Sequence, residues 1–296
     1  METLFITGQG GFIGSHLVEH LSKNYKIIGL GKTKLKNSKI IQINQDILKV
    51  TSQIIPKNVA GIIHLAAITD VQFCQKNPKK CFQVNVQGTQ NLLEICRKRH
   101  LKFLFLSTSH VFGSPKTIPI NEEQPRHPTS VYASSKLCGE VLCESYAKSF
   151  DLDISIIRLF SIYGPKSPNH LVISKIISQL LAKNIIQIGN LKSKRDFLYI
   201  DDAMEAISLL LKKIRGFNQF NVGSGESHSI SDLYKIITKI SKNNVKLEQN
   251  TSLIRKNDIP EMVSDSTKLR KLGWKPKIDL SEGLRLTYDW FKEKPT

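Results

Sequence analysis

The feature that most constrains this chain is a glycine-rich segment directly after a short apolar run. Residues 3–7 (TLFIT) predict a buried β-strand, and a helical pattern follows over 13–23. Between them the sequence reads Gly8-Gln9-Gly10-Gly11-Phe12-Ile13-Gly14. Glycines at 8, 11 and 14 permit a tight turn, close approach of the backbone to a pyrophosphate and close packing of the helix. A strand, this turn and a helix together predict a dinucleotide-binding unit.

The first half of the chain alternates short apolar runs with helical patterns, which is typical of a parallel sheet with crossover helices. Further strands are expected at 26–30, 40–43, 61–65, 102–107 and 154–159, with helices at 79–99 and 130–150. After residue 165 we expect helices at 171–183, 201–214, 231–241, 266–272 and 281–292, and strands at 185–188, 196–200 and 219–222. The pattern predicts an α/β fold, a Rossmann-like doubly wound parallel sheet with a smaller C-terminal α/β substrate lobe. The expected domains are 1–163, with about 197–223 returning to pack on it, and 164–296 as mainly the substrate-binding lobe.

Charge and cysteine content exclude several other classes of protein. The 296 residues include 43 Lys+Arg against 25 Asp+Glu, a net charge of +18, but the lysines are dispersed rather than gathered into one stripe. We expect a basic solvated surface and no nucleic-acid partner. No apolar run approaches the roughly 18 residues of a membrane span, and the first residues lack a signal peptide, so a cytoplasmic protein without a membrane partner is expected. The five cysteines lack metal-ligand spacing, which predicts free thiols and no metal site.

The segment after the second expected strand bears on the choice of dinucleotide. An NAD enzyme usually places an acidic residue there, bonded to the adenosine ribose. This chain instead reads Gly29-Leu30-Gly31-Lys32-Thr33-Lys34, without a carboxylate. Lys32 and Lys34 could bind a 2′-phosphate, which favours NADP. Alternatively both lysines are solvated, and the protein accepts NAD or NADP.

Further motifs occur in a specific order along the chain. They are Asp46-Ile47, His64-Leu65-Ala66-Ala67, Asn85-Val86-Gln87-Gly88-Thr89 and Tyr132-Ala133-Ser134-Ser135-Lys136. With the glycine segment, this ordered set resembles the extended short-chain dehydrogenase/reductase family, which contains sugar-nucleotide epimerases, dehydratases and reductases. The resemblance covers nearly the whole chain. It implies a dinucleotide site formed by Gly8, Gly11, Phe12, Ile13, Gly14, Lys32, Asp46, Ile47, Leu65, Ala66, Ala67, Tyr132 and Lys136.

The resemblance also implies the catalytic groups. Tyr132 and Lys136 lie one helical turn apart, so both face the same side of the helix. The Lys136 ammonium can favour the ionised form of Tyr132, which exchanges a proton with a sugar oxygen. Thr108 is implied to bond the same oxygen, with Ser109 as the second choice. His110 occupies the position of a glutamate in family dehydratases, and is either an acid/base at a carbon next to the ketone or a spectator in the pocket.

Substrate binding is implied for the C-terminal part of the chain. Arg195-Asp196-Phe197 and the segment beginning at Arg255 resemble family segments whose arginines hold the substrate diphosphate, as a planar fork of donors allows. These segments are most similar to the branch that handles GDP-6-deoxy-hexoses, which contains GDP-mannose 4,6-dehydratase and GDP-4-keto-6-deoxy-mannose reductase. Ser161 departs from the pattern, because the family usually has a substrate-binding asparagine there.

Three functions are compatible with these residues. The leading hypothesis is an NAD(P)H-dependent reductase of the C4 ketone of a nucleotide-linked 4-keto-6-deoxy sugar. GDP is the favoured nucleotide. The alternatives are an NAD-dependent nucleotide-sugar 4-epimerase or dehydratase, and a non-catalytic dinucleotide-sensing protein. Position 110 carries histidine instead of the glutamate of family dehydratases, which argues against dehydration. The combination of Thr108, Tyr132 and Lys136 argues against a sensor. The resemblance further implies a homodimer formed through the helices at 79–99 and 130–150.

Overall fold

The computed structural model describes residues 1–36, 40–182, 185–243, 245–254 and 258–294. These residues form two compact units. The first consists of Met1–Gly113, Pro125–Leu159 and Met204–Phe220, and the second of Ser114–Gln124, Phe160–Ala203 and Asn221–Thr296. In the part of the chain that is described, no helix combines the length and apolar character needed to cross a membrane. All five cysteines are free, and four of them are buried.

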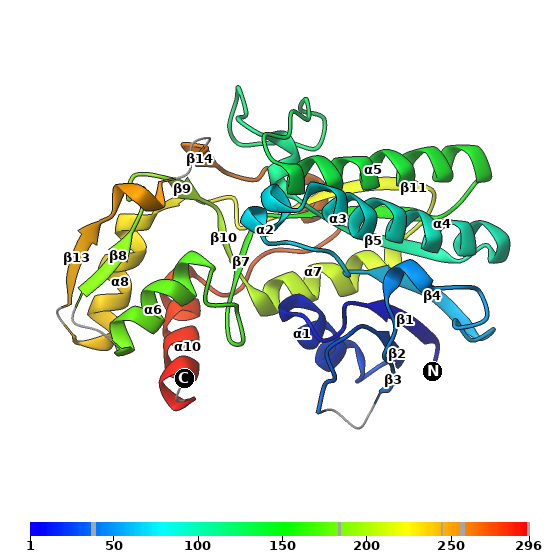
Figure 1. The fold of residues 1–296 in the computed structure, drawn as a ribbon, viewed down its shortest axis with the longest axis horizontal. Helices are drawn as coiled ribbons and strands as arrows, with labels where there is room; N and C mark the ends of the chain where they lie inside the picture. Colours follow the sequence, from blue (N-terminus) through cyan, green and yellow to red (C-terminus); the bar gives the residue numbers. More distant parts are fainter. Residues whose placement is uncertain (37–39, 183–184, 244, 255–257, 295–296) are drawn as a thin grey trace. The chain divides into compact units, whose positions relative to one another are not determined.

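The first unit contains a parallel sheet of seven strands (Figure 1). Its strands are β1 (Thr3–Thr7), β2 (Lys26–Leu30), β3 (Ile41–Ile43), β4 (Val59–His64), β5 (Lys102–Thr108), β6 (Ile154–Leu159) and β11 (Phe217–Val222). Their order across the sheet is β11-β6-β5-β4-β1-β2-β3. The order therefore reverses between β1 and β4, which is the topological switch point of a doubly wound sheet. The predicted Rossmann-like fold is confirmed.

Helices cover both faces of this sheet (Figure 1). α1 (Phe12–Leu21) packs near β1, whereas α4 (Gly88–Arg99) and α5 (Val131–Phe150) pack against each other and against β5. α5 begins where the Ser130 side chain accepts a hydrogen bond from the Ala133 amide, and it ends at Asp151 in the left-handed conformation. Ser130 is a favourable N-cap, because its oxygen satisfies an amide that lacks a partner within the helix.

The expected helix over 79–99 is not uniform. α2 (Val71–Lys76) precedes α3 (Pro78–Phe82), and a π-helical turn over Gln83–Gln87 separates α3 from α4. The buried Asn85 lies in this turn, with its side chain bonded to the backbone of Ile68 on both its oxygen and its nitrogen. A wider turn at a point of long-range hydrogen bonding is common near functional sites. The helical pattern alone did not indicate this interruption.

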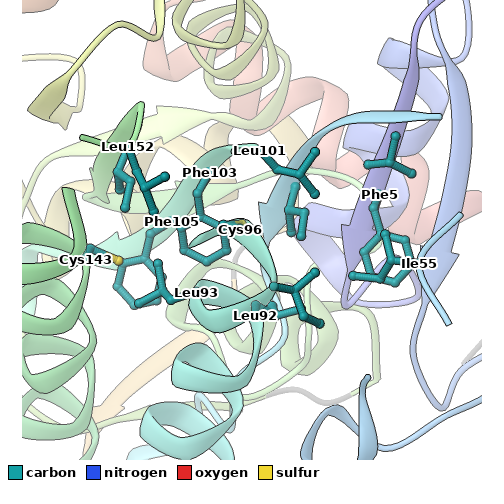
Figure 2. Packing of buried hydrophobic residues seen from close by; sticks show 14 of the residues in the cluster. Phe5, Ile55, Leu92, Leu93, Cys96, Leu101, Phe103, Phe105, Cys143 and Leu152 are labelled. Atoms are coloured by element: carbon teal, nitrogen blue, oxygen red, sulfur yellow. The ribbon is translucent and has the colours of Figure 1, made fainter. Parts of the chain in front are cut away.

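A continuous apolar cluster fills the space between the sheet and the helices (Figure 2). Phe103 and Phe105 of β5, both fully buried, lie among side chains of α4 and α5. Figure 2 also shows Leu92, Leu93 and Cys96 from α4 and Cys143 from α5 in this cluster. Burial of each large side chain contributes roughly 1.5–3 kcal/mol relative to exposure, so this cluster supplies much of the driving force that holds helices on the sheet.

One buried ion-pair network crosses this apolar layer. Glu140 of α5 is fully buried and accepts hydrogen bonds from Ser107 (2.5 Å) and Arg158 (3.0 Å and 2.9 Å). Arg158, on β6, is also fully buried and donates to Gln219 of β11 at 2.5 Å. Arg126 adds a second guanidinium at 3.3 Å from Glu140. The network joins α5 to three neighbouring strands and neutralises charges that burial would otherwise make costly.

The second unit is built from smaller sheets and three longer helices. Its strands pair as β7 (Ser161–Tyr163) with β10 (Phe197–Tyr199), β8 (Ile185–Ile188) with β13 (Lys246–Gln249), and β12 (His228–Ser229) with β9 (Lys194–Arg195) and β14 (Glu261–Met262). The helices are α6 (Val172–Ala182), α8 (Ile230–Ser241) and α10 (Leu280–Glu293), with the short α9 (Thr267–Arg270). α7 (Ile200–Lys213) begins in the second unit and continues in the first.

Two buried carboxylates hold the second unit together. Asp196 accepts hydrogen bonds from the backbone amides of Ser224, Gly225 and Ser264 and from both serine hydroxyls. Asp202 accepts from the amides of Lys277 and Ile278, each at 3.0 Å. These bonds connect residues 224–278 to the segment around residue 200. The donated hydrogen bonds satisfy the two buried carboxylates.

The Glu140 network gives a prediction about stability. In the Glu140→Gln variant the buried Arg158 guanidinium loses its counter-charge, and we expect unfolding free energy to fall by about 3 kcal/mol. Urea denaturation measures this change. The matched control is Glu144→Gln on the same helix, whose partner Lys148 is exposed, with an expected loss below about 1 kcal/mol. Equal losses in the two variants would contradict the assignment.

Candidate functional site

The predicted dinucleotide turn lies at the switch point of the sheet. The Gly8 amide donates to the Leu30 carbonyl at 2.7 Å, which joins the end of β1 to the end of β2. Gly8 has φ +77°, and a Cβ there would lie 2.8 Å from the backbone nitrogen of Ala66, just after β4. Only glycine fits this conformation and this approach. The turn therefore brings three strand ends together at the edge where ligands of such sheets bind.

The other glycines of the turn have different roles. A Cβ on Gly14, in the first turn of α1, would overlap the carbonyl oxygen of Gly8, so this position allows α1 to start close to the strand. Gly11 is exposed, and the nearest atom to a Cβ there is 3.4 Å away. Gly11 is the N-cap of α1, and it has no side chain that could accept a hydrogen bond from the first amides of the helix. Phe12 and Ile13, the first residues of the helix, are partly exposed. Such unsatisfied amides suit a phosphate group.

The residues after β2 and β3 meet in an ion pair. Lys32 Nζ lies 3.0 Å from Asp46 Oδ2, and the lysine side chain is 72% exposed. The hydrogen bond from the Leu48 amide, followed by that from Lys32, lowers the pKa of Asp46. Ile47 is buried beside Gly88 at the start of α4. Lys32 and Asp46, both expected at the adenosine end of the dinucleotide, are thus adjacent, and Lys34 is exposed in the same loop.

A chain of buried hydrogen bonds supports the segment after β4. Thr7 Oγ1 lies 2.7 Å from His64 Nδ1, and His64 Nε2 lies 3.1 Å from Thr89 Oγ1. Burial, with the nearby charge of Lys136, holds the pKa of His64 well below its ordinary value, so the ring stays neutral. Thr7 also accepts from the Ala66 amide at 3.2 Å. These bonds position Leu65, Ala66 and Ala67, which are partly exposed directly after the strand.

The end of β5 carries the expected hydroxyl groups. Thr108 ends the strand, and its side chain accepts the His110 amide at 3.3 Å, which starts a 3₁₀ turn over Ser109–Phe112. Ser109 is buried, whereas His110 is partly exposed. The turn ends at Gly113, whose φ is +62° and where a Cβ would overlap the His127 carbonyl oxygen. The tight turn holds all three expected residues at one strand end.

Tyr132 and Lys136 are placed next to this strand end by α5. Burial raises the pKa of Tyr132 to about 12, and the neighbouring Thr108 side chain acts in the opposite direction. Lys136 is 3% exposed, and its ammonium lies 4.1 Å from the centre of the Phe105 ring. Burial lowers the pKa of Lys136 to about 8, against the raising effects of Cys143 and Glu140. The sequence-predicted residues Thr108, Tyr132 and Lys136 therefore form one cluster.

Two supporting residues were missed by the sequence analysis. Asn85 Nδ2 donates to Ser135 Oγ at 2.9 Å, and Ser135 Oγ donates to the Tyr132 carbonyl at 2.7 Å. These bonds fix the start of α5 against the π-helical turn. The sequence indicated Asn85 and Ser135 only as members of motifs, without a supporting role. Polar residues on the inner face of a helix were the signal that could have identified them.

Gln9 was also missed. It lies within the glycine turn, is 1% exposed, and its Nε2 donates to the Thr33 carbonyl at 3.3 Å. Its side chain crosses the end of β2 above Gly29 and Gly31. A glycine inside a short strand and another directly after it indicate that another group approaches closely, and this signal could have pointed to Gln9.

Ser161 and Arg195, expected to bind the substrate, belong to the second unit, whereas Ser109 belongs to the first. The Ser161 amide donates to the carbonyl of Asp196 at 3.0 Å. Asp196 directly follows Arg195 in the sequence. Arg195 donates to Asp258 at 2.9 Å and to the Ile259 carbonyl at 2.8 Å. Asn190 bonds the other oxygen of Asp258 at 2.8 Å. Arg195 is thus held in place by a carboxylate, and Arg255 lies outside the described residues.

The turn gives a prediction that separates folding from ligand binding. Gly14→Ala forces a methyl group onto the Gly8 carbonyl, so stability should fall by about 1–3 kcal/mol and dinucleotide binding should be lost. Gly11→Ala meets no close protein atom and should cost less than about 1 kcal/mol, yet its methyl group obstructs a pyrophosphate. Thermal unfolding and isothermal titration with NADH and NADPH measure both effects. Full binding by Gly11→Ala would argue against a phosphate at this turn.

Comparisons with known proteins agree with this geometry. A family model described as GDP-mannose 4,6 dehydratase matches residues 5–287. A putative UDP-glucose 4-epimerase of Methanocaldococcus jannaschii is 32% identical over 98% of both chains. The GDP-6-deoxy-D-mannose reductase of Pseudomonas aeruginosa is 28% identical over 98% of this chain and 97% of its own.

A solved structure shows the same fold with ligands. The UDP-glucuronic acid 4-epimerase of Bacillus cereus, in complex with UDP-glucuronic acid and NAD, has a TM-score of 0.91 and 32% identity, and covers 98% of this chain and 99% of its own. The relatives share the fold and nucleotide-sugar chemistry, although their reactions differ. By the extent of these matches, the chain belongs to the extended short-chain dehydrogenase/reductase family of nicotinamide-dinucleotide-dependent enzymes that modify nucleotide-linked sugars.

Proposed function

We propose that this enzyme is a reductase that converts the C4 ketone of a nucleotide-linked 4-keto-6-deoxy sugar to an alcohol. The observation that carries the proposal is the cluster of Thr108, Tyr132 and Lys136 beside the end of β5. A tyrosine hydroxyl is protonated at neutral pH and can donate its proton to a ketone oxygen. The similarity to the GDP-6-deoxy-D-mannose reductase of Pseudomonas aeruginosa supports reduction as the reaction.

The residues around Tyr132 support this role. Thr108 lies at the end of β5 next to Tyr132, and we propose that both hydroxyls contact the same ketone oxygen. Lys136, with a pKa of about 8, is mostly protonated at neutral pH, and its charge favours the anion left when Tyr132 gives up its proton. We assign proton donation to Tyr132, alignment of the ketone to Thr108, and charge stabilisation to Lys136. Ser109 adjoins Thr108, and we propose that it contacts the substrate.

The residues of the glycine turn fit a nicotinamide dinucleotide. Gly11 leaves space for a pyrophosphate at the start of α1, whereas Gly8 and Gly14 allow the close backbone packing that shapes the turn. We propose that Asp46 and Ile47 contact the adenine and that Leu65, Ala66 and Ala67 contact the dinucleotide. Bound NADH or NADPH would supply the hydride. Lys32 and the missing carboxylate after β2 support use of NADPH as well as NADH. Lys136 would also bond the nicotinamide ribose.

The nucleotide of the proposed substrate is GDP. The matching family model and the Pseudomonas reductase both concern GDP-linked sugars, which favours GDP. Arg195 is proposed to bind the diphosphate, in competition with its bond to Asp258, and Arg255 is proposed for the same group. Ser161 takes the position where an asparagine is usual. His110 offers an imidazole rather than a carboxylate, which disfavours dehydration, and we propose that it lines the pocket.

A 4-epimerase is the second candidate. It is favoured by the similarity to epimerases such as the Bacillus cereus enzyme, whose structure contains NAD. An epimerase retains its dinucleotide through a full cycle, whereas a reductase consumes one equivalent for each sugar. Stoichiometry therefore separates the two reactions.

We further propose that the enzyme is a homodimer. Phe82 of α3 and Val141 of α5 expose 37% and 54% of their surface, although both are apolar. They belong to the helices at which family members associate. A second copy of the chain would remove this apolar area from water.

The experiment that tests the reductase follows NAD(P)H absorbance with a panel of GDP-, UDP- and dTDP-linked 4-keto-6-deoxy sugars. We expect one equivalent to be consumed for each sugar reduced. Tyr132→Phe should lower kcat by about 10²–10⁴-fold with little change in NADH or NADPH affinity, because only the proton donor is lost. No consumption with any sugar, combined with interconversion of C4 isomers and dinucleotide released on denaturation, would establish the epimerase instead.

The loop after β2 gives a prediction about the dinucleotide. Replacing Lys32 and Lys34 with Ala should weaken NADPH binding about tenfold and leave NADH binding nearly unchanged, because only NADPH carries the 2′-phosphate. Fluorescence titration measures both affinities. Lys36→Ala, an exposed lysine of the same loop, is the matched control. An equal change for both dinucleotides would remove the support for NADPH.

A further inference from the structure

Gln9 contains a buried acceptor that the protein does not satisfy. Its side chain is 1% exposed, and within the described ranges its Oε1 has no hydrogen-bond partner. The only other such side-chain atom in the described part of the chain is Oδ1 of Asn221, in the second unit. Buried acceptors are normally paired, because losing water without a replacement donor is unfavourable. The place of Gln9 in the dinucleotide turn suggests that a ligand provides the donor.

The side chain of Gln9 fills the space above Gly29 of β2 and above Gly31, which follows the strand. A Cβ on Gly29 would lie 2.7 Å from Gln9 Cγ, and a Cβ on Gly31 would lie 2.6 Å from Gln9 Oε1. Neither position can carry a side chain while Gln9 keeps this conformation. Gly31 directly follows β2, where an NAD enzyme usually has its ribose-binding carboxylate. The Gln9 amide therefore occupies the space of that missing side chain.

The amide has a defined orientation. Nε2 donates to the Thr33 carbonyl at 3.3 Å, which leaves Oε1 at Gly31 as the acceptor. A ribose hydroxyl is a donor of the kind that this oxygen lacks. Unlike a carboxylate, the amide carries no charge, so it does not repel a phosphate on the neighbouring ribose carbon. Among the charged groups of the adjacent loops, Lys32 and Asp46 form an ion pair with each other, and Lys34 is exposed.

We propose that Gln9 accepts a hydrogen bond from the adenosine ribose. It thereby replaces the carboxylate that NAD enzymes usually carry at the position of Gly31. The uncharged acceptor makes the subsite compatible with the 2′-hydroxyl of NADH and with the 2′-phosphate of NADPH. Gln9 is thus a specificity-determining residue for the dinucleotide. The inference rests on dinucleotide binding within the proposed function and is independent of which sugar is reduced.

The test measures dissociation constants for NADH and NADPH without any sugar, by isothermal titration, with thermal unfolding as a check on folding. Gln9→Glu is nearly isosteric and places a charge at the proposed acceptor. We expect it to raise the NADH-to-NADPH affinity ratio at least tenfold. A residue that merely fills space would change both affinities by the same factor.

A double-variant cycle tests whether Gln9 takes the place of a carboxylate at position 31. Gly31→Asp should weaken both dinucleotides, because its side chain collides with Gln9. Gln9→Gly combined with Gly31→Asp removes the collision, and we expect it to restore NADH binding while NADPH binding stays weak. The proposal is overturned if the double variant binds NADH no better than Gly31→Asp does, or if Gln9→Glu leaves the affinity ratio unchanged. If the unmodified enzyme binds neither dinucleotide, the proposed function fails as well.

Discussion

The site depends on how closely backbone segments approach one another at the carboxyl ends of β1, β2 and β4. Gly8 contacts the segment after β4, and Gly14 lies against Gly8 itself. A Cβ on Gly10 would lie 2.5 Å from the Thr33 carbonyl oxygen, so the loop after β2 closes on the same turn. With side chains at these positions, the three strand ends would be forced apart. The edge of the sheet would then lose the shape that a dinucleotide requires.

The catalytic cluster depends on a second constraint, which is the position of α5. Tyr132, Lys136 and Glu140 are spaced by four residues and therefore lie along one face of the helix. Glu140 anchors this face to β5 through Ser107 and to β6 through Arg158. Ser107 immediately precedes Thr108, so the anchor also fixes the strand end that carries the hydroxyl groups. The buried ion pair thus helps to hold in place α5, which carries Tyr132, and the end of β5, which carries Thr108.

Much of the first unit could be predicted because its signals are local. The bounds of β1, β2 and β6 agree with the expected ranges, and α1 and α5 differ from theirs by at most two residues at either end. The smaller strands of the second unit were harder to predict. β7, β9, β12 and β14 contain two or three residues each, too few to show alternation, and they form only because neighbouring strands provide partners. The π-helical turn was missed because the apolar spacing of 79–99 is nearly the same with or without it.

The amino-acid sequence by itself determined the strand–turn–helix unit, the order of the motifs, and the spacing of Tyr132 and Lys136. These features depend on short-range geometry, on glycine conformations and on helical periodicity, which neighbouring residues specify. The tertiary structure alone decided which polar groups meet: Asn85 with Ser135, Lys32 with Asp46, and Gln9 with the space left by Gly29 and Gly31. Such partners are far apart in the sequence, and a side chain's hydrogen-bonding capacity does not indicate which group will satisfy it. Their contacts exist because the packed sheet and helices bring them together.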